Sequence, residues 1–191
     1  MKLSITNSTV VDDISENEIF QGCLKGNIKY QKILFDRYSG KFMTVCLRYA
    51  SDQMQAEDML QEAFIRIFNH LNQFKSEGSF EGWMRRVVVN VCLKAIKNKR
   101  ITFSTDEDAG IQIPDKSTDA PGHLSEDELL RLIKQLPNGY RIIFNLHVIE
   151  GYSHDEIGEM LNIKASTSRS QLVKARKMLQ QQIINMQKIA V

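Results

Sequence analysis

The sequence predicts an all-α protein: two small helical domains joined by an acidic flexible linker, the second ending in a helix-turn-helix. Apolar residues recur at helical spacing along most of the 191 residues, and strand-like alternation is absent over any useful length. The stretch 101–124 carries two of the three prolines and few large apolar residues, as expected of an extended linker. Residues 150–176 have the pattern of a helix-turn-helix.

The first part of the chain is expected to hold a flexible extension, residues 1–16, and one compact domain, residues 17–100. Four helices are predicted in that domain, over residues 17–24, 28–49, 54–71 and 80–97. The second carries an apolar stripe that includes Leu34 and Phe42, and the fourth carries one that includes Val87. These stripes predict one shared core.

The last part of the chain is expected to form a four-helix domain, residues 125–185. Ser125 and Glu128 have the spacing of a capping box, which predicts the start of a helix that Pro137 ends. A further helix is predicted over residues 139–149. The helix-turn-helix completes the domain.

A second capping box, Ser153-x-x-Glu156, predicts the start of the first helix of the helix-turn-helix. Gly158 lies on its inward face, where a side chain would keep two helices from crossing closely. The turn is predicted over residues 161–164, and the second helix from about Ala165 onward.

The second helix of this motif has one apolar and one basic face. The inward residues are Leu172, Ala175 and Leu179, and the outward ones are Arg169, Ser170, Val173, Lys174 and Lys177. From Lys164 onward there are six basic residues and no acidic one. Such a face suits contacts to phosphates and base edges in a DNA major groove. The alternative is an ordinary helical hairpin with a solvated basic face.

The fourth helix of the first domain is also basic on one side, with Arg86, Asn90, Lys94 and Lys97 at helical spacing. Residues 75–100 hold seven basic residues against two acidic ones. The cations can hold a phosphate backbone, and Asn90 can hydrogen-bond a base edge. Trp83, beside the loop 75–79, is either a core residue or a stacking platform for an extruded nucleotide.

Several classes of function are not expected. Cys23, Cys46 and Cys92 are odd in number, form no CxxC and have no His at ligand spacing, which indicates buried thiols in a reducing cytosol. His147 and His154 flank a turn without ligand partners. No apolar run has the length of a signal peptide or a membrane span. We therefore expect a cytoplasmic protein with no catalytic residues, no metal and no cofactor.

Four segments in this order and spacing resemble the extracytoplasmic-function (ECF) group of the sigma-70 family of RNA polymerase sigma factors. They are Ala-Glu-Asp-Met-Leu-Gln-Glu-Ala-Phe (56–64), Ser-Phe-Glu-Gly-Trp-Met-Arg-Arg-Val-Val-Val-Asn (79–90), Leu-Pro-Asn-Gly-Tyr-Arg-Ile-Ile-Phe (136–144) and the segment 150–176. The resemblance covers about residues 17–185. It implies that residues 17–100 are sigma domain 2 and residues 125–185 are sigma domain 4. It also implies core RNA polymerase, promoter DNA and an anti-sigma factor as partners.

The resemblance assigns roles to individual residues. Asp58, Gln61 and Glu62 match the motif that contacts the clamp helices of RNA polymerase. The loop 75–79 and Asn90 match the pocket that takes a flipped base of the non-template strand. With their basic neighbours, they give the expected −10 contacts: Lys75, Ser76, Ser79, Arg86, Asn90, Lys94 and Lys97. The expected −35 contacts are Arg169, Ser170, Val173, Lys174 and Arg176.

Three positions depart from the family's usual pattern, and they bear on promoter preference. Lys164 stands where a Ser cap is common, and lysine caps poorly. Gln171 replaces a frequent Arg, which is expected to remove one phosphate contact. Lys94 stands where an Asp is common, which makes that face more basic.

Alternatives stay open for the linker and for the function. The linker either runs through polymerase channels, as in the family, or is a passive solvated spacer. A self-sufficient helix-turn-helix repressor or activator, with residues 17–100 as a dimer or ligand domain, predicts tight binding to a palindrome without polymerase. A helical adaptor that binds only proteins leaves both basic faces unexplained.

Overall fold

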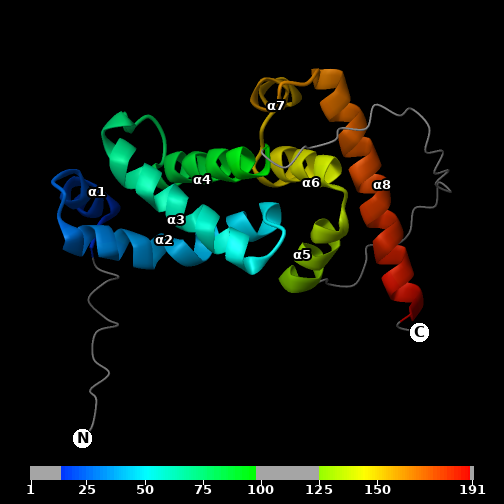
Figure 1. The fold of residues 1–191 in the computed structure, drawn as a ribbon, viewed down its shortest axis with the longest axis horizontal. Coiled ribbons are helices and arrows are strands. Elements are labelled where there is room, and N and C mark those ends of the chain that lie inside the picture. The colour runs from blue at the N-terminus through cyan, green and yellow to red at the C-terminus, as the bar shows by residue number, and fades with distance from the viewer. Residues whose placement is uncertain (1–13, 98–124, 190–191) are drawn as a thin grey trace, which may run out of the picture. The chain divides into compact units, whose positions relative to one another are not determined.

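The computed structural model describes residues 14–97 and 125–189. All regular secondary structure in these ranges is helical, which confirms the predicted fold class (Figure 1). The chain forms two compact units, Met1–Asn98 and Lys99–Val191. The predicted linker, and the predicted extension up to residue 13, lie outside the described residues.

Within residues 14–97, the helices stand where the sequence predicts them. They are α1 Glu16–Leu24, α2 Ile28–Tyr49, α3 Gln53–His70 and α4 Phe80–Lys97, with a 3-10 turn, η1 Leu71–Gln73, after α3. Ser15, Asn27 and Asp52 each accept a hydrogen bond from a backbone N–H two or three residues further on. These caps fix where α1, α2 and α3 begin, because they satisfy donors that a helix leaves free at its start.

The core of the first unit lies between α2, α3 and α4, which pack against one another, while α1 packs on α2 (Figure 1). Leu34, Phe42 and Met84 are completely buried there. The Tyr38 hydroxyl donates a hydrogen bond of 2.6 Å to the Glu16 carboxylate and ties α1 to α2.

An aromatic cluster closes one part of this unit and consists of Phe20, Phe74, Phe80 and Trp83. The Phe80 ring lies 5.1 Å from Phe20, 5.2 Å from Phe74 and 5.9 Å from Trp83, measured between centroids. Phe80 is buried, whereas Trp83 is only partly buried. Trp83 therefore packs against the core while remaining partly accessible, and its role as a stacking platform stays a prediction.

Within residues 125–189, the helices are α5 Glu126–Gln135, α6 Asn138–Phe144, α7 His154–Leu161 and α8 Ala165–Ile189. Both predicted capping boxes are formed, at Ser125 with Glu128 and at Ser153 with Glu156. Helix α8 packs against α5, α6 and α7, and the predicted inward residues Leu172, Ala175 and Leu179 are buried.

The helix predicted over residues 139–149 changes its winding half-way. After α6 the chain forms a π-helical turn, η2 Asn145–Ile149. The Glu150 N–H donates to the Asn145 carbonyl, five residues back, at 2.9 Å. Apolar periodicity does not distinguish a π-turn from an α-turn, so the extent was predicted and the winding was not.

The turn of the helix-turn-helix depends on two backbone features. Asn162 ends α7 in the left-handed conformation, with φ of 56°. A Cβ atom at Gly158 would lie 2.9 Å from the Ile163 carbonyl oxygen and 3.6 Å from the Ala165 nitrogen. The prediction that a side chain at Gly158 would block a close approach is confirmed, and the approaching group is the backbone of the turn and of the start of α8.

Candidate nucleic-acid interface

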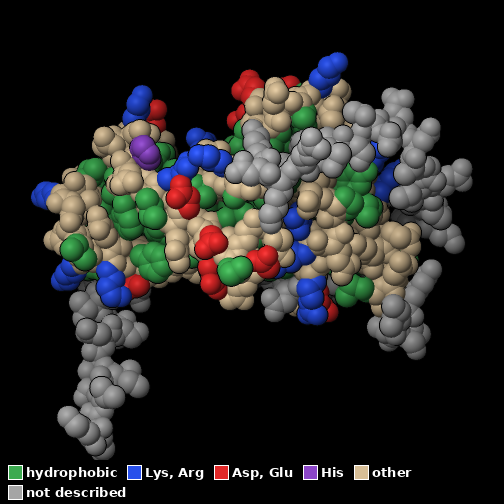
Figure 2. Space-filling model, viewed as in Figure 1, with side chains coloured by type: hydrophobic (Ala, Val, Ile, Leu, Met, Phe, Trp, Pro, Cys, Tyr) green, Lys and Arg blue, Asp and Glu red, His purple; other side chains and the backbone are tan. Residues whose placement is uncertain are grey.

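The predicted recognition residues lie on the solvent side of α8. Arg169, Ser170, Val173 and Arg176 are exposed, and Lys174 is partly buried. Val173 is 54% exposed, so a branched apolar side chain stands among polar ones, where it can contact a thymine methyl group. Figure 2 shows acidic side chains gathered over α7, and Asp155, Glu156 and Glu159 are the exposed acidic residues of that helix. This division of charge favours α8 over α7 for contact with DNA.

The replacement of a frequent Arg by Gln171 places a buried amide at this position of α8, and the expected loss of a phosphate contact stays a prediction. The Gln171 side chain is only 1% exposed, and so it faces the core. The reason is helical spacing, because Gln171 shares the inward side of α8 with Ser168 and Ala175, which are also buried. The candidate DNA-facing surface of α8 therefore excludes Gln171 and includes exposed residues such as Arg169, Ser170 and Val173.

In the first unit, a cavity of about 300 Å³ opens beside the loop 75–79 and the start of α4. It is lined by Gln73, Phe74, Lys75, Glu77, Gly78, Ser79, Gly82, Trp83 and Arg86. Ser76 and Gly78 adopt left-handed backbone conformations, with φ of 59° and 99°, which turn the chain sharply. Ser79 Oγ accepts a hydrogen bond of 3.0 Å from the Gly82 N–H and joins the loop to α4.

Only part of the predicted −10 set is brought together at this cavity. Lys75, Ser79 and Arg86 line it. Ser76 belongs to the loop but does not line the cavity, and Asn90 is exposed on α4 about one turn beyond Arg86. The side chain of Lys97 is outside the described residues.

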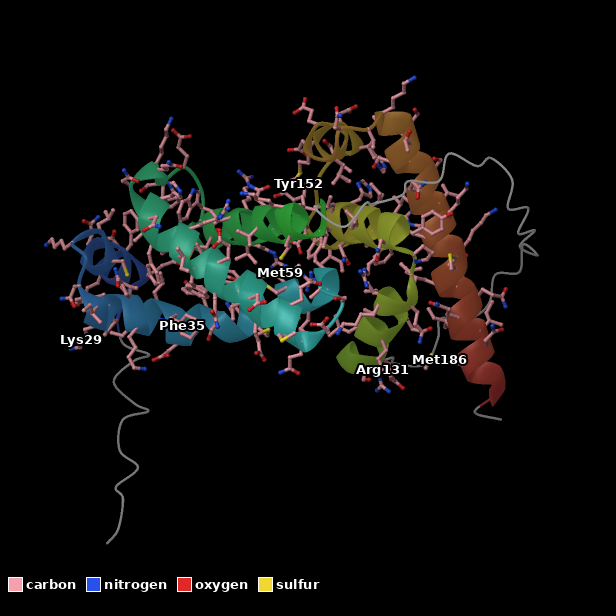
Figure 3. The ribbon with its side chains drawn as sticks, viewed as in Figure 1. Lys29, Phe35, Met59, Arg131, Tyr152 and Met186 are labelled. Carbon is pink, nitrogen blue, oxygen red and sulfur yellow. The ribbon has the colours of Figure 1, made fainter. Side chains whose placement is uncertain are left out.

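Lys94 lies elsewhere, in a second cavity of about 340 Å³ between α3 and α4. Its other lining residues are Gln55, Asp58, Met59, Glu62, Arg66, Val91 and Ala95. Met59 is buried between the two helices (Figure 3). Lys94 is thus grouped with two of the three predicted polymerase contacts instead of with the loop 75–79.

The exposed side of α3 carries all three predicted polymerase contacts. Asp58, Gln61 and Glu62 are exposed, and Gln61 lies outside the second cavity. Glu62 accepts a hydrogen bond of 2.7 Å from Arg66 Nε, one turn further on. Ile65 on the same helix is 55% exposed. This surface combines acidic, amide and apolar groups, as protein interfaces do.

Sequence reasoning missed Gln73, Phe74 and Gly82 as residues of the first cavity. Phe74 had a usable signal, because an aromatic residue stands directly before a basic, glycine-containing loop. Gln73 and Gly82 had none, since η1 and the first turn of α4 bring them to the cavity only in the folded chain.

The two histidines that flank the turn before α7 are neighbours in the structure. The rings of His147 and His154 stack at 4.1 Å between centroids, with 15° between their planes. No group of three or more His, Cys, Asp or Glu residues able to hold a metal ion occurs among the described residues. Within the same residues, no helix has both the length and the apolar character needed to cross a bilayer.

Comparison with known families matches both units. The family model of sigma-70 region 2 matches residues 34–101, and that of sigma-70 region 4 matches residues 126–179. The chain belongs to the sigma-70 family. Within this family it is 29% identical over 163 residues to the ECF RNA polymerase sigma factor SigW of Bacillus subtilis, covering 78% of this chain and 87% of that protein. It is 26% identical over 187 residues to the ECF RNA polymerase sigma-E factor of Haemophilus influenzae, covering 91% of this chain and 98% of that protein.

These relatives show that this chain is an ECF sigma factor of the sigma-70 family. Sigma factors are a class of transcription factors and not an enzyme family. Among solved structures, the sigma factor RpoE in complex with the anti-sigma factor NepR from Bartonella quintana has a similar fold, with a TM-score of 0.52. That match has 16% sequence identity and covers 83% of this chain and 98% of the RpoE chain.

Proposed function

We propose that this ECF sigma factor binds core RNA polymerase, recognises the −35 and −10 elements of promoters and helps to initiate transcription at them. The observation that carries the proposal is that each compact unit has its own surface suited to DNA. We further propose that the chain acts in the cytoplasm, where polymerase and promoter DNA are found, and that it has no catalytic activity of its own.

The basic side of α8 is the proposed −35 contact. Arg169 at its start is exposed and can form a bidentate contact with guanine, which discriminates by about 1–3 kcal/mol against a wrong base. Val173 and Ser170 lie on the same exposed side and can contact further base edges. Lys174 and Arg176 are proposed to hold the flanking phosphates.

The first cavity is the proposed site for a flipped base of the −10 element. Its lining combines the aromatic surface of Phe74 and Trp83 with the cations of Lys75 and Arg86. Opening DNA costs about 1.4 kcal/mol per base-pair step in lost stacking. Stacking one extruded base on an aromatic ring returns about 1–3 kcal/mol, so a single captured base offsets about one step. Asn90, further along α4, is proposed to contact the freed strand.

The exposed side of α3 is the proposed polymerase contact, through Asp58, Gln61 and Glu62. Lys94 is better assigned to this surface than to the −10 contacts, because it shares a cavity with Asp58 and Glu62. A cation beside two carboxylates orders their side chains and lowers the repulsion between them.

Binding to polymerase explains how two weak DNA surfaces act together. Each surface makes few contacts, and holding both on one large enzyme raises their effective concentration at the promoter. The linker 101–124 is proposed either to run through polymerase channels or to act as a passive spacer. We expect an anti-sigma protein among the partners, since the similar RpoE fold was solved in complex with one.

The proposal is tested by transcription with purified core RNA polymerase, this protein and a promoter library, followed by sequencing of the transcripts. Arg169→Ala is expected to lose selectivity at one position of the −35 element by about 1–3 kcal/mol. Asp58→Ala is expected to weaken polymerase binding, whereas Asp36→Ala, an exposed acidic residue on α2, serves as the matched control. Normal polymerase binding by Asp58→Ala would overturn the α3 assignment.

The same experiment separates this proposal from a self-sufficient repressor or activator. That alternative requires tight binding to a palindromic site by the chain alone. Nanomolar binding to a palindrome, together with no response to core polymerase, would overturn the proposed function.

A further inference from the structure

A chain of three side chains connects the π-turn η2 to the start of the recognition helix α8. His147 on η2 stacks on His154, the first residue of α7, with ring centroids 4.1 Å apart. His154 Nδ1 lies 2.9 Å from Ser168 Oγ on the first turns of α8. Ser168 is completely buried, and the next residue along α8 is Arg169, the first exposed residue of the proposed −35 surface.

The His147 ring is fixed from its other side. Its Nδ1 lies 2.8 Å from the backbone carbonyl oxygen of Tyr152, on the connection between η2 and α7 (Figure 3). A carbonyl oxygen only accepts hydrogen bonds, so Nδ1 of His147 carries the hydrogen and donates it. The Tyr152 N–H in turn donates to the Leu146 carbonyl at 2.9 Å. His154 therefore stacks on a ring whose orientation is set by backbone.

We propose that His154 is a positioning residue for −35 recognition, which holds the first turn of α8 through Ser168 so that Arg169 points at the DNA. The inference rests on the proposed function of α8. His154 itself is proposed to touch no DNA, and it belongs to none of the proposed −35, −10 or polymerase contacts. The relevant contact is short and buried at the α8 end, where a small rotation of the first turn changes the direction of the long Arg169 side chain.

The charges around His154 make this positioning sensitive to pH. The groups that face it are His147 from η2, Asp155 from α7, and Arg169 and Arg176 from α8. Partial burial, followed by His147 and then Arg169, lowers the pKa of His154 below its ordinary value of 6.5, with Asp155 acting in the opposite direction. The folded arrangement thus favours the neutral ring. A positive charge on the His154 ring would be repelled by Arg169 and Arg176.

The test measures −35 discrimination by the full-length protein with core RNA polymerase. Discrimination is the ratio of transcripts from a preferred promoter to those from the same promoter with a changed −35 element. His154→Phe keeps a stacking ring and removes Nδ1, so we expect discrimination to fall about 2- to 10-fold, as for the loss of one hydrogen bond. His154→Asn places an amide atom at the position of Nδ1 and is expected to retain most of the discrimination.

Ser168→Ala removes the other partner of the same hydrogen bond and is expected to have a similar effect. The double variant of His154→Phe and Ser168→Ala is then expected to lose no more than either single variant, because the two changes remove one interaction. Losses that simply add would overturn the proposal. Discrimination at the −10 element, which depends on the other unit, is the internal control for intact protein and is expected to stay unchanged.

The pH dependence supplies a readout that a merely structural role would not change. Between about pH 8 and pH 5, a window that extends below the ordinary histidine pKa, wild-type −35 discrimination is expected to fall as His154 gains a proton, whereas His154→Asn is expected to show no such fall. If wild type discriminates and His154→Phe matches it at both pH values, the positioning role is wrong and the proposed function stands. If the wild-type complex ignores the −35 sequence altogether, the proposed function of α8 is itself wrong.

Discussion

Replacing Gly158 by alanine tests whether backbone contact between α7 and the following turn sets the geometry of the helix-turn-helix. The added Cβ would lie 2.9 Å from the Ile163 carbonyl oxygen, closer than such atoms normally approach. That neighbour is backbone, so relief requires the turn and the start of α8 to move. Overpacking of this kind costs about 1–3 kcal/mol. Alanine in a helix recovers about 1 kcal/mol of conformational preference, which leaves a net loss of about 0–2 kcal/mol.

Gly40 on α2 provides the matched control, because it is exposed and nothing lies within 4 Å of an added Cβ. Gly40→Ala gains the helical preference without the clash and is expected to stabilise the first unit by about 0.5–1 kcal/mol. The two substitutions are chemically identical, so their difference of about 1–3 kcal/mol isolates the steric cost at the turn.

The assay is urea unfolding followed by far-ultraviolet circular dichroism, with the free energy of unfolding compared between each variant and wild type. The −35 discrimination of Gly158→Ala is measured alongside and is expected to fall, since α8 must shift. If Gly158→Ala proves as stable as Gly40→Ala, the close approach does not determine the turn and the reasoning is refuted.

Three further predictions concern the first unit. Trp83→Ala is expected to destabilise the open complex by about 1–3 kcal/mol through loss of base stacking, whereas Trp83→Phe is expected to retain most of the open-complex stability. Promoter melting, assayed with a reagent specific for single-stranded DNA, checks this. If the two variants behave alike, Trp83 does not belong to the base site. Lys94→Ala is expected to weaken binding to core polymerase, measured by competition binding, and to leave −10 selectivity in transcription intact. Normal polymerase binding with reduced −10 selectivity would instead assign Lys94 to the DNA contacts. Burial raises the pKa of the Cys23 thiol to about 11, so its reactive thiolate is scarce at pH 8. Iodoacetamide is therefore expected to label Cys23 slowly in the native protein and quickly in urea, and fast native labelling would contradict this.

The sequence predicts the helices well because capping residues and apolar periodicity are local signals. Ser125, Asn162 and Pro137 all act within a few residues of their own position, and the predicted helix ends agree closely with those observed. The π-turn at Asn145–Ile149 was not predicted, since its widened winding depends on hydrogen bonds that the apolar pattern does not encode.

The candidate sites were predictable only where one helix carries them. Arg169, Ser170 and Val173 follow from the face of a single helix, and they are exposed as expected. Contacts between helices were not predicted: the sequence grouped Lys94 with Arg86 because both lie on α4, whereas the structure also places Lys94 in a cavity with Asp58 of α3. The stacking of His147 on His154 likewise depends on how η2 and α7 pack.

Trp83 is the sole tryptophan of the chain, and it lies in the lining of the cavity proposed to take an extruded base. Indole emission from this polypeptide consequently comes from a single place. A nucleobase that settles on that ring would quench the signal directly, whereas duplex bound only along α8 would leave it unaltered. The wild-type chain therefore carries its own optical reporter of strand capture, and titration with single-stranded oligonucleotides can follow that event without any attached dye.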